Sequence, residues 1–458
     1  MEDEDEKLET FFQWAANLGV TDSPSLSQNR ASSCLGESVV VSCFPEAGGR
    51  GLASIRELTR GELILRVPKA ALFTRDSVLE DPSLSFRIKR YPRLSSAQIL
   101  VVCLLAEVGK GRNSQWAPYL MQLPRFYHTL SSFVWFEIQA LQVDDAIWAS
   151  EKAVSRTQSE WKDALLLMQE IGLRPQLLTF KSWLWACGTV STRTMHIPWD
   201  DAGCLCPVGD FANYAAPEDD SHYTENVENS PRLTDGVYEK DLAAYCFYAR
   251  KHYRKGEQVL LCYGTYTNLE LLEHYGFVLN SNPSDKAFIP LEADIQSSSP
   301  WASESLYIQP DGKPSFALLS TLRLWATPQK LRKTQQHLTY EGALFSVENE
   351  VLVMEWLAKR CLDVLNKLPT TLEEDCALLE AIDEHRREKS KVLMGSEPEL
   401  IQFFQEHGLQ GGCQIPNKVV RSMQRWELAV KWRYIYKKTI AKCVTHCSQM
   451  LSDLSSQI

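Results

Sequence analysis

Four short segments, far apart in the chain, carry the residues whose types and spacing could do chemistry. The first segment spans Gly48, Gly49, Arg50, Gly51 and Leu52. Glycines let a backbone come close to a ligand and leave N–H groups free to contact an anion. A tight β-turn would explain the same glycine cluster without a ligand.

The second segment, residues 188–194, places Thr192 next to Arg193. A hydroxyl beside a guanidinium could hold a ligand carboxylate, because the planar guanidinium matches carboxylate geometry. The simpler alternative is that Arg193 ends an element and pairs with a nearby acid.

The third segment, PVGDFANY at residues 207–214, contains Asp210 and Asn213. Local bonds to the backbone after the Pro-Val-Gly turn would account for Asp210. Asn213 offers both donors and an acceptor, which suits an amino-acid-like ligand.

The fourth segment, KGEQVLLCYG at residues 255–264, ends at Tyr263-Gly264, and a second Tyr-Gly pair follows at Tyr275. Two tyrosines in this context could supply hydroxyls to an apolar channel. Taken singly, each could equally be a half-buried aromatic with its hydroxyl at the surface.

The common catalytic signatures are missing. The chain has no GxSxG elbow, no phosphate-binding GxxxxGK[ST] loop, no HExxH and no full GxGxxG. None of the 13 cysteines forms a C-x-x-C pair, so a tetrahedral zinc cage is not expected. Reduced thiols fit an intracellular compartment.

The composition is that of a globular chain of 458 residues, 44% hydrophobic and 10% aromatic. No apolar run approaches the ~20 residues of a membrane-spanning helix, so no membrane partner is expected. The net charge of −10 disfavours direct binding to nucleic acid and favours basic partners such as Lys-rich protein segments. The acidic start, MEDEDEK, is unlike a leader or transit peptide and favours the cytoplasm or nucleus over the chloroplast.

Local patterns predict the elements that must position these segments. Strands are expected in GESVVVSCF and GELILRVP, and the glycine-rich AGGRGLAS between them is expected to be a turn. Further strands are expected over residues 189–280, on either side of a solvated loop at 218–240. Helical spacing predicts helices at 8–16, 98–108, 161–171, 267–275 and 351–368. Residues 415–442 form a basic helical stretch, interpreted as a solvated face plus a core stripe, with a face for an acidic partner as the alternative.

In this order, the segments resemble the SET-domain methyltransferases of the Rubisco large-subunit methyltransferase-like class. GGRGL is similar to that family's first cofactor motif, DFAN-Y stands where it has Asp-x-x-Asn-His, and GEQVLLCYG is similar to its Gly-Glu-x-apolar-x-x-Tyr-Gly strand. WAPYL at 116–120 with Leu123-Pro124 resembles a Trp-x-Pro-Tyr segment of the family's helical insertion. The likeness covers roughly residues 36–445.

The resemblance implies an α+β chain with a SET fold, made of small curled β-sheets with a knot-like crossing around residues 210–214 and 263–277. A helical insertion splits this fold, and an all-α C-terminal domain follows. The expected parts are an acidic helix and linker at 1–35, the first SET part at 36–75, the insertion at 76–188, the catalytic SET part at 189–285, and a substrate-binding-type domain at 286–458.

The implied cofactor is S-adenosylmethionine, and the implied activity is methyl transfer to a lysine of a non-histone protein. Some relatives methylate histidine, and a SET-fold peptide-binding protein without turnover is a further alternative. A protein substrate and a monomeric state are expected. By resemblance, Tyr263 is the catalytic tyrosine and Tyr275 walls the substrate channel. The implied cofactor-binding residues are Gly48, Gly49, Arg50, Thr192, Arg193, Asn213, Tyr214, Tyr263 and Phe277.

The chain departs from the family pattern in two places. Tyr214 replaces the histidine after the asparagine, and Ala215 stands where a small polar residue is usual. No cysteine-rich segment follows Phe277, so no metal and no zinc-closed flap are expected, and the helical domain would have to close the site.

Overall fold

The computed structural model describes residues 2–23, 33–47, 49–217, 235–387, 397–409 and 415–456. These residues form two compact units. The first comprises Met1–Ser132, Lys152–Thr265 and His274–Gly276, and the second comprises Phe133–Glu151, Tyr266–Glu273 and Phe277–Ile458. The boundaries that the sequence analysis expects for the five parts of the chain stay a prediction.

Three small sheets form the β part of the first unit. Their orders are β1-β2-β9-β6, β3-β8-β7 and β4-β5. All neighbouring strands are antiparallel except β6 and β9, which run parallel. The strands are β1 (Val39–Phe44), β2 (Gly49–Ser54), β3 (Leu63–Pro68), β4 (Thr194–Ile197), β5 (Asp200–Leu205), β6 (Asn213–Tyr214), β7 (Gly236–Glu239), β8 (Ala244–Tyr248) and β9 (Gln258–Leu261).

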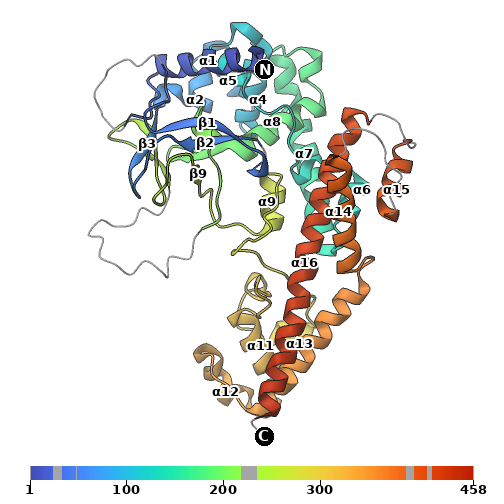
Figure 1. The fold of residues 1–458 in the computed structure, drawn as a ribbon. Helices are drawn as coiled ribbons and strands as arrows, with labels where there is room; N and C mark the ends of the chain where they lie inside the picture. The colour runs from blue at the N-terminus through green and yellow to red at the C-terminus, as the bar shows by residue number, and fades with distance from the viewer. Residues whose placement is uncertain are drawn as a thin grey trace. The chain divides into compact units, whose positions relative to one another are not determined.

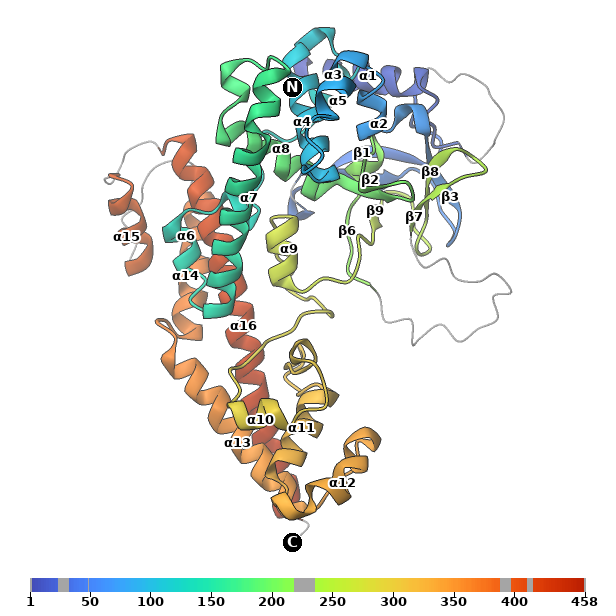
Figure 2. The same cartoon turned by 180° about the vertical axis from the view of Figure 1, so that it is seen from behind.

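Helices of the first unit gather beside these sheets (Figures 1 and 2). They are α1 (Glu2–Asn17), α2 (Arg75–Val78), α3 (Pro82–Ile88), α4 (Ser96–Lys110), α5 (Ala117–Leu120), most of α7 (Asp144–Glu170) and α8 (Phe180–Arg193). The start of α4 shows why the helix begins there, since Ser95 and Gln98 form a reciprocal capping box. Helices at 8–16, 98–108 and 161–171 are confirmed, each as part of a longer helix.

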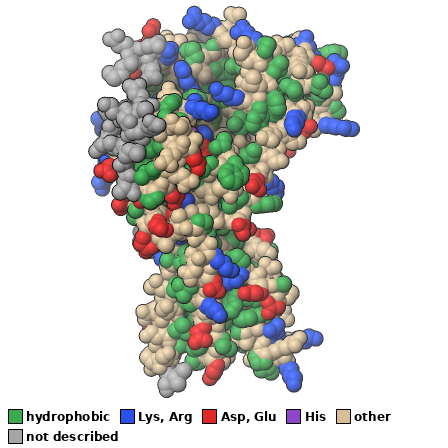
Figure 3. All heavy atoms as spheres, turned by 90° about the vertical axis from the view of Figure 1, so that its right-hand side faces the viewer, with side chains coloured by type: hydrophobic (Ala, Val, Ile, Leu, Met, Phe, Trp, Pro, Cys, Tyr) green, Lys and Arg blue, Asp and Glu red, His purple; other side chains and the backbone are tan. Residues whose placement is uncertain are grey.

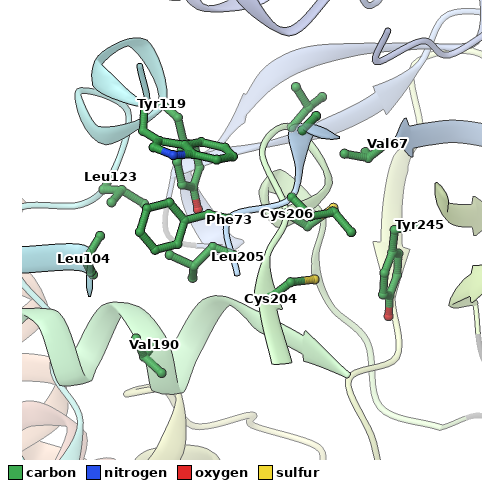
Figure 4. Packing of buried hydrophobic residues seen from close by; sticks show 14 of the residues in the cluster. Val67, Phe73, Leu104, Tyr119, Leu123, Val190, Cys204, Leu205, Cys206 and Tyr245 are labelled. Atoms are coloured by element: carbon green, nitrogen blue, oxygen red, sulfur yellow. The ribbon is translucent and has the colours of Figure 1, made fainter. Parts of the chain in front are cut away.

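The core of the first unit joins its sheets to its helices. Phe73 pairs through its backbone with Leu205 at the end of β5, and its ring lies edge-on to Trp116 at 5.1 Å. Figure 4 shows Phe73 among Leu104 of α4, Tyr119 of α5 and Leu205. All three neighbours are fully buried. Burial of this apolar surface is what holds the scattered strands in place.

Helices make up most of the second unit. They are α6 (Trp135–Gln139), α9 (Asn268–His274, of which His274 belongs to the first unit), α10 (Ala293–Ser298), α11 (Phe316–Ala326), α12 (Gln329–Glu341), α13 (Val347–Lys367), α14 (Leu372–Arg387), α15 (Pro398–Glu406) and α16 (Asn417–Ser455). Figure 1 shows the long α16 running alongside α13 and α14. Helices at 267–275 and 351–368 are confirmed.

Short 3₁₀ helices join several of these elements. They are η1 (Pro45–Ala47), η2 (Lys69–Ala71), η3 (Gly111–Asn113), η4 (Leu130–Ser132), η5 (Pro175–Leu177), η6 (Gly209–Phe211) and η8 (Ser303–Ser305).

Three local predictions were wrong. Most of the glycine-rich segment is not a turn, because residues 49–54 form strand β2, paired along its whole length with β1. Residues 189–193 do not return to strand but complete helix α8. Within the polar segment 218–240, residues 218–234 lie outside the described part of the chain, and residues 236–239 form strand β7, paired with β8.

The basic stretch at 415–442 is helical, as predicted, but its charges are not all solvated. Arg433 and Lys437 are both only 1% exposed. Each forms an ion pair with Asp375 of α14, at 2.7 Å, and Asp375 is itself fully buried. A helical charge pattern cannot reveal such burial, because it depends on a carboxylate supplied by another helix.

Candidate active site

The parallel pairing of β6 with β9 brings the third and fourth segments together. Asn213 lies opposite Leu260, and Tyr214 lies opposite Leu261. Tyr263 follows two residues after the end of β9. It therefore lies close to the segment around β6, including Ala212. This is the crossing that the sequence predicted around residues 210–214 and 263–277.

Two tyrosine hydroxyls bond across this crossing in opposite directions. Tyr263 donates its hydroxyl to the carbonyl of Ala212 at 2.5 Å, and Tyr214 donates its hydroxyl to the carbonyl of Gly264 at 3.0 Å. The rings of Tyr214 and Tyr263 have centroids 5.2 Å apart. Tyr214 therefore braces the crossing at the position where the family pattern has histidine.

The catalytic candidate Tyr263 also contacts the second candidate, Tyr275. Their ring centroids are 5.2 Å apart, so Tyr214, Tyr263 and Tyr275 form a continuous row of aromatic rings. Burial raises the pKa of Tyr263, with Asp210 adding to the effect and Arg193 opposing it. Tyr263 is therefore a neutral phenol at physiological pH and has no capacity to act as a general base.

The glycine-rich segment meets the same site through the amide of Asn213. The Asn213 Nδ2 donates to the carbonyl of Arg50 at 3.2 Å. At Gly51, an added Cβ would lie 2.7 Å from that Nδ2, so only glycine allows this approach. At Gly49, with φ +128°, an added Cβ would meet no atom within 4 Å.

The side chain of Arg50 binds residues other than Asn213. Its guanidinium donates to the side-chain and main-chain oxygens of Gln122, at 2.8 and 2.7 Å, and lies over the ring of Phe211. Arg50 therefore offers its backbone to the site, as the resemblance implies. Gly48 lies outside the described residues.

Arg193 pairs with an acid, in agreement with the simpler of the two alternatives. It donates to the carbonyl and to Oδ2 of Asp210, at 2.9 and 3.1 Å, and the hydroxyl of Tyr119 donates to the same Oδ2 at 2.8 Å. The Asp210 carboxylate is 1% exposed. The pair fixes the start of the segment that carries Asn213. It uses Nη1 of Arg193, whereas the buried Nε has no hydrogen-bond partner among the described residues.

Among the described residues, no hydrogen bond joins the Thr192 side chain to the other candidates. Its hydroxyl donates to the carbonyl of Gly188, one turn earlier in α8, at 2.8 Å. Phe277 belongs to the second unit, and its role in cofactor binding stays a prediction. The structure thus brings together Gly49, Arg50, Arg193, Asn213, Tyr214, Tyr263 and Tyr275.

The backbone before Asn213 is strained. Val208 is fully buried and has φ +71°, a conformation that a β-branched residue rarely adopts. At the next residue, Gly209, an added Cβ would lie 2.3 Å from the ring of Phe247. Close packing on both sides holds the turn that delivers Ala212 and Asn213 to the crossing.

Several participants were not identified from the sequence. The carbonyl of Ala212 is a backbone group, and no residue type signals it. Tyr119 was noted only as part of a family motif, and its bond to Asp210 spans 91 positions of the chain. Gln258, whose Nε2 is buried without a hydrogen-bond partner among the described residues, carries no motif of its own.

Neither a metal site nor a membrane-spanning helix is found among the described residues. Among the described residues, no group of three or more His, Cys, Asp or Glu side chains could hold a metal ion. No helix within the described part of the chain is both long and apolar enough to span a bilayer.

Comparisons with known proteins place these features in context. A family model described as Rubisco LSMT substrate-binding matches residues 270–437. The chain is 48% identical to Protein SET DOMAIN GROUP 40 of Arabidopsis thaliana over 489 aligned residues, covering 99% of this chain and 98% of the relative. It is 26% identical to human actin-histidine N-methyltransferase, covering 75% of this chain and 61% of that protein.

A solved structure has the same fold. It is the crystal structure of the SET domain of LSMT bound to lysine and AdoHcy, with a TM-score of 0.61 at 20% sequence identity. The match covers 98% of this chain and 93% of that one. The predicted architecture, with small SET sheets and a helical C-terminal region, is therefore confirmed.

Proposed function

Because the chain belongs to the SET-domain methyltransferases of the Rubisco large-subunit methyltransferase class, we propose that it methylates a lysine side chain of a non-histone protein. The methyl donor in this proposal is S-adenosylmethionine. The observation that carries the proposal is the hydroxyl of Tyr263, held by the carbonyl of Ala212 within the row of tyrosine rings.

The residues around Asn213 fit such a donor. Asn213 uses one amide N–H for Arg50 and keeps its oxygen and second N–H without a protein partner among the described residues. The backbone at Gly49 is open to solvent space on its Cα side. Asn213, Tyr214 and the backbone of Gly49 and Arg50 would hold the amino-acid and nucleoside parts. When bound, S-adenosylmethionine supplies an electrophilic methyl group on a sulfonium.

Tyr263 positions the acceptor amine rather than removing its proton. Its hydroxyl hydrogen is committed to Ala212, so its oxygen lone pairs remain available to accept a hydrogen bond from an amine. Loss of hydration beside the rings of Tyr214, Tyr263 and Tyr275 would lower the pKa of an entering lysine and so favour its neutral amine. Holding the neutral amine in line with the methyl group is the main contribution that this geometry supports.

The test begins with calorimetric titration of S-adenosylmethionine into the purified protein and into Asn213→Ala. We expect saturable binding that weakens at least about tenfold in the variant, because the amide contacts are lost. A labelled-methyl screen of cell extract follows, with Tyr263→Phe as the control. We expect this variant to bind the cofactor and to lose most transfer. Absence of binding by the intact protein would overturn the proposal in favour of a peptide-binding protein without turnover.

Histidine is the second candidate acceptor, because the human actin-histidine N-methyltransferase is among the relatives. Fragmentation mass spectrometry of the labelled protein distinguishes the two acceptors by the residue that carries the added methyl group. A methylated imidazole would replace lysine in the proposal and leave the assigned cofactor residues unchanged.

A further inference from the structure

A groove in the second unit presents the basic face of α16. Its volume is about 590 Å³, and its walls come from residues 280–285, Pro310, Leu379 of α14 and one stripe of α16. The stripe carries Lys431, Lys438 and Lys442. These positions recur at helical spacing on one side of α16, whereas Arg433 and Lys437 point into the core.

The three lysines differ in how far their charge is compensated. Lys431 forms an ion pair with Glu427 at 2.7 Å. Lys442 donates to the carbonyl of Pro310 at 2.8 Å, which leaves its charge without a carboxylate. Lys438 lies over the ring of Tyr434, with 5.8 Å between Nζ and the ring centroid, and no ion pair involves it among the described residues. Lys438 and Lys442 are both exposed.

The acidic groups on the groove are already used within the protein. Asp285 accepts hydrogen bonds from the main chain and side chain of Asn268, at 2.9 and 2.8 Å. Burial raises the pKa of Asp285, the hydrogen bonds notwithstanding. The groove therefore carries a local excess of positive charge in a chain whose net charge is −10. Figure 3 shows basic and acidic side chains interspersed over one face of the molecule.

We propose that this groove binds an acidic segment of the protein substrate, so that α16 contributes to the choice of substrate. The inference rests on the proposed function. The distance from Lys431 to Lys442 along the helix is about 16 Å at 1.5 Å per residue. That length corresponds to about five residues of extended peptide, with acidic side chains able to meet Lys438 and Lys442. The family model that matches residues 270–437 is described as substrate-binding; it includes the wall at 280–285 and Lys431, and it ends just before Lys438.

An acidic peptide fits better than a nucleic acid. Strand binding by nucleic acids uses exposed aromatic rings on which bases stack. The aromatic ring in this groove, Tyr434, is half-buried and covered by the Lys438 ammonium. Asn280 and Ser281, both exposed on the opposite wall, offer an amide and a hydroxyl donor to carboxylates.

The direct test uses a short fluorescein-labelled oligoglutamate as the probe, titrated with the full-length protein and followed by fluorescence anisotropy. We expect saturable binding that weakens with added salt. Lys438→Glu combined with Lys442→Glu should weaken it at least about tenfold, and Lys438→Gln with Lys442→Gln by a smaller factor. The matched control reverses two exposed lysines of α12, Lys330→Glu with Lys333→Glu, and should change affinity less than about twofold.

Two outcomes would overturn the proposal: absence of probe binding by the wild-type protein, and an equal loss in the α12 control. Tighter, lysine-dependent binding of labelled oligouridylate would do the same by making the groove a nucleic-acid site. A second readout compares how fast the wild type and the α16 variant transfer labelled methyl groups to extract proteins when the extract is limiting. The α16 variant should need about tenfold more extract to reach the same labelling rate. Its affinity for S-adenosylmethionine should stay unchanged. If the wild type fails to bind S-adenosylmethionine, the proposed function fails, and the oligoglutamate result still decides the groove.

Discussion

At the scale of single residues, the site depends on two hydroxyl-to-carbonyl bonds that cross between its two segments. Tyr263 is tied to Ala212, and Tyr214 is tied to Gly264, the residue after Tyr263. Each tyrosine thus anchors the backbone that carries the other. The imidazole of a histidine at position 214 would be shorter than the phenol of Tyr214. The departure from the family pattern therefore comes with the additional hydrogen bond from Tyr214 to the Gly264 carbonyl.

Replacing Tyr214 with phenylalanine tests this bond. The change removes the phenol that donates to the Gly264 carbonyl and leaves that carbonyl with only the weak thiol donor of Cys262, in a site where Tyr214 is only 9% exposed. We expect a loss of about 1–2 kcal/mol in the free energy of unfolding, measured by urea denaturation. The matched control is Tyr340→Phe, because that side chain is 60% exposed and should tolerate the change. Equal stability of the Tyr214 variant and the wild type would show that the hydroxyl contributes nothing to the crossing.

At the scale of elements, helix α16 is fastened to its unit by buried ionic contacts as well as by apolar packing. Glu137 of α6 is fully buried and accepts from Ser422 and Arg425. Further along the helix, Lys437 donates to Asp375 and to the carbonyl of Thr370. These partners come from two separate stretches of chain, around Glu137 and over residues 370–375, and both attach to α16.

Removing the shared carboxylate should be far more damaging than removing a neighbouring one. In Asp375→Asn, Lys437 loses its counter-charge and Arg433 keeps only that of Glu399, and we expect a loss of about 3–5 kcal/mol in unfolding free energy. Glu373→Gln changes an exposed residue on the same helix and should alter stability by less than about 0.5 kcal/mol. Comparable urea midpoints for the two variants would contradict the assignment of Asp375 as the centre of the network.

At the scale of the whole molecule, buried thiols make stability depend on alkaline pH. Burial raises the pKa of Cys34, Cys103 and Cys204, each to about 12. In the unfolded chain these thiols ionise near pH 8.5, so the folded state holds protons that the unfolded state has released. Their contribution is fully present below about pH 8.5 and is lost as the pH rises toward 12.

We therefore expect the urea midpoint, measured under reducing conditions, to fall between pH 8 and pH 10. Each of these thiols contributes a loss of up to about 1.4 kcal/mol per pH unit over the upper part of this range. Cys103→Ala should flatten the dependence, because it removes one of the titrating groups. A midpoint that stays constant across this range would show that the thiols do not remain protonated in the folded protein.

The sequence by itself determined the features that depend on local order. Helical spacing of apolar residues located the helices at 98–108 and 351–368, because the residues that form the apolar face of a helix all lie within one continuous segment. The order of four motifs was enough to indicate the SET fold and to select Asn213, Tyr263 and Tyr275 as candidates. Of the two alternatives for Arg193, the structure shows the pairing with an acid, and the contact with a ligand carboxylate stays a prediction.

Only the tertiary structure decided the features that depend on partners distant in sequence. The glycine-rich segment became a strand because β1 and β9 pair with it on both sides, and local turn chemistry cannot report that pairing. Arg433 and Lys437 are buried because Asp375 meets them from another helix. The Ala212 carbonyl became part of the site through the parallel pairing of β6 with β9. In each case a residue's role was set by a neighbour contributed by a remote part of the chain, and local residue patterns carry no record of such neighbours.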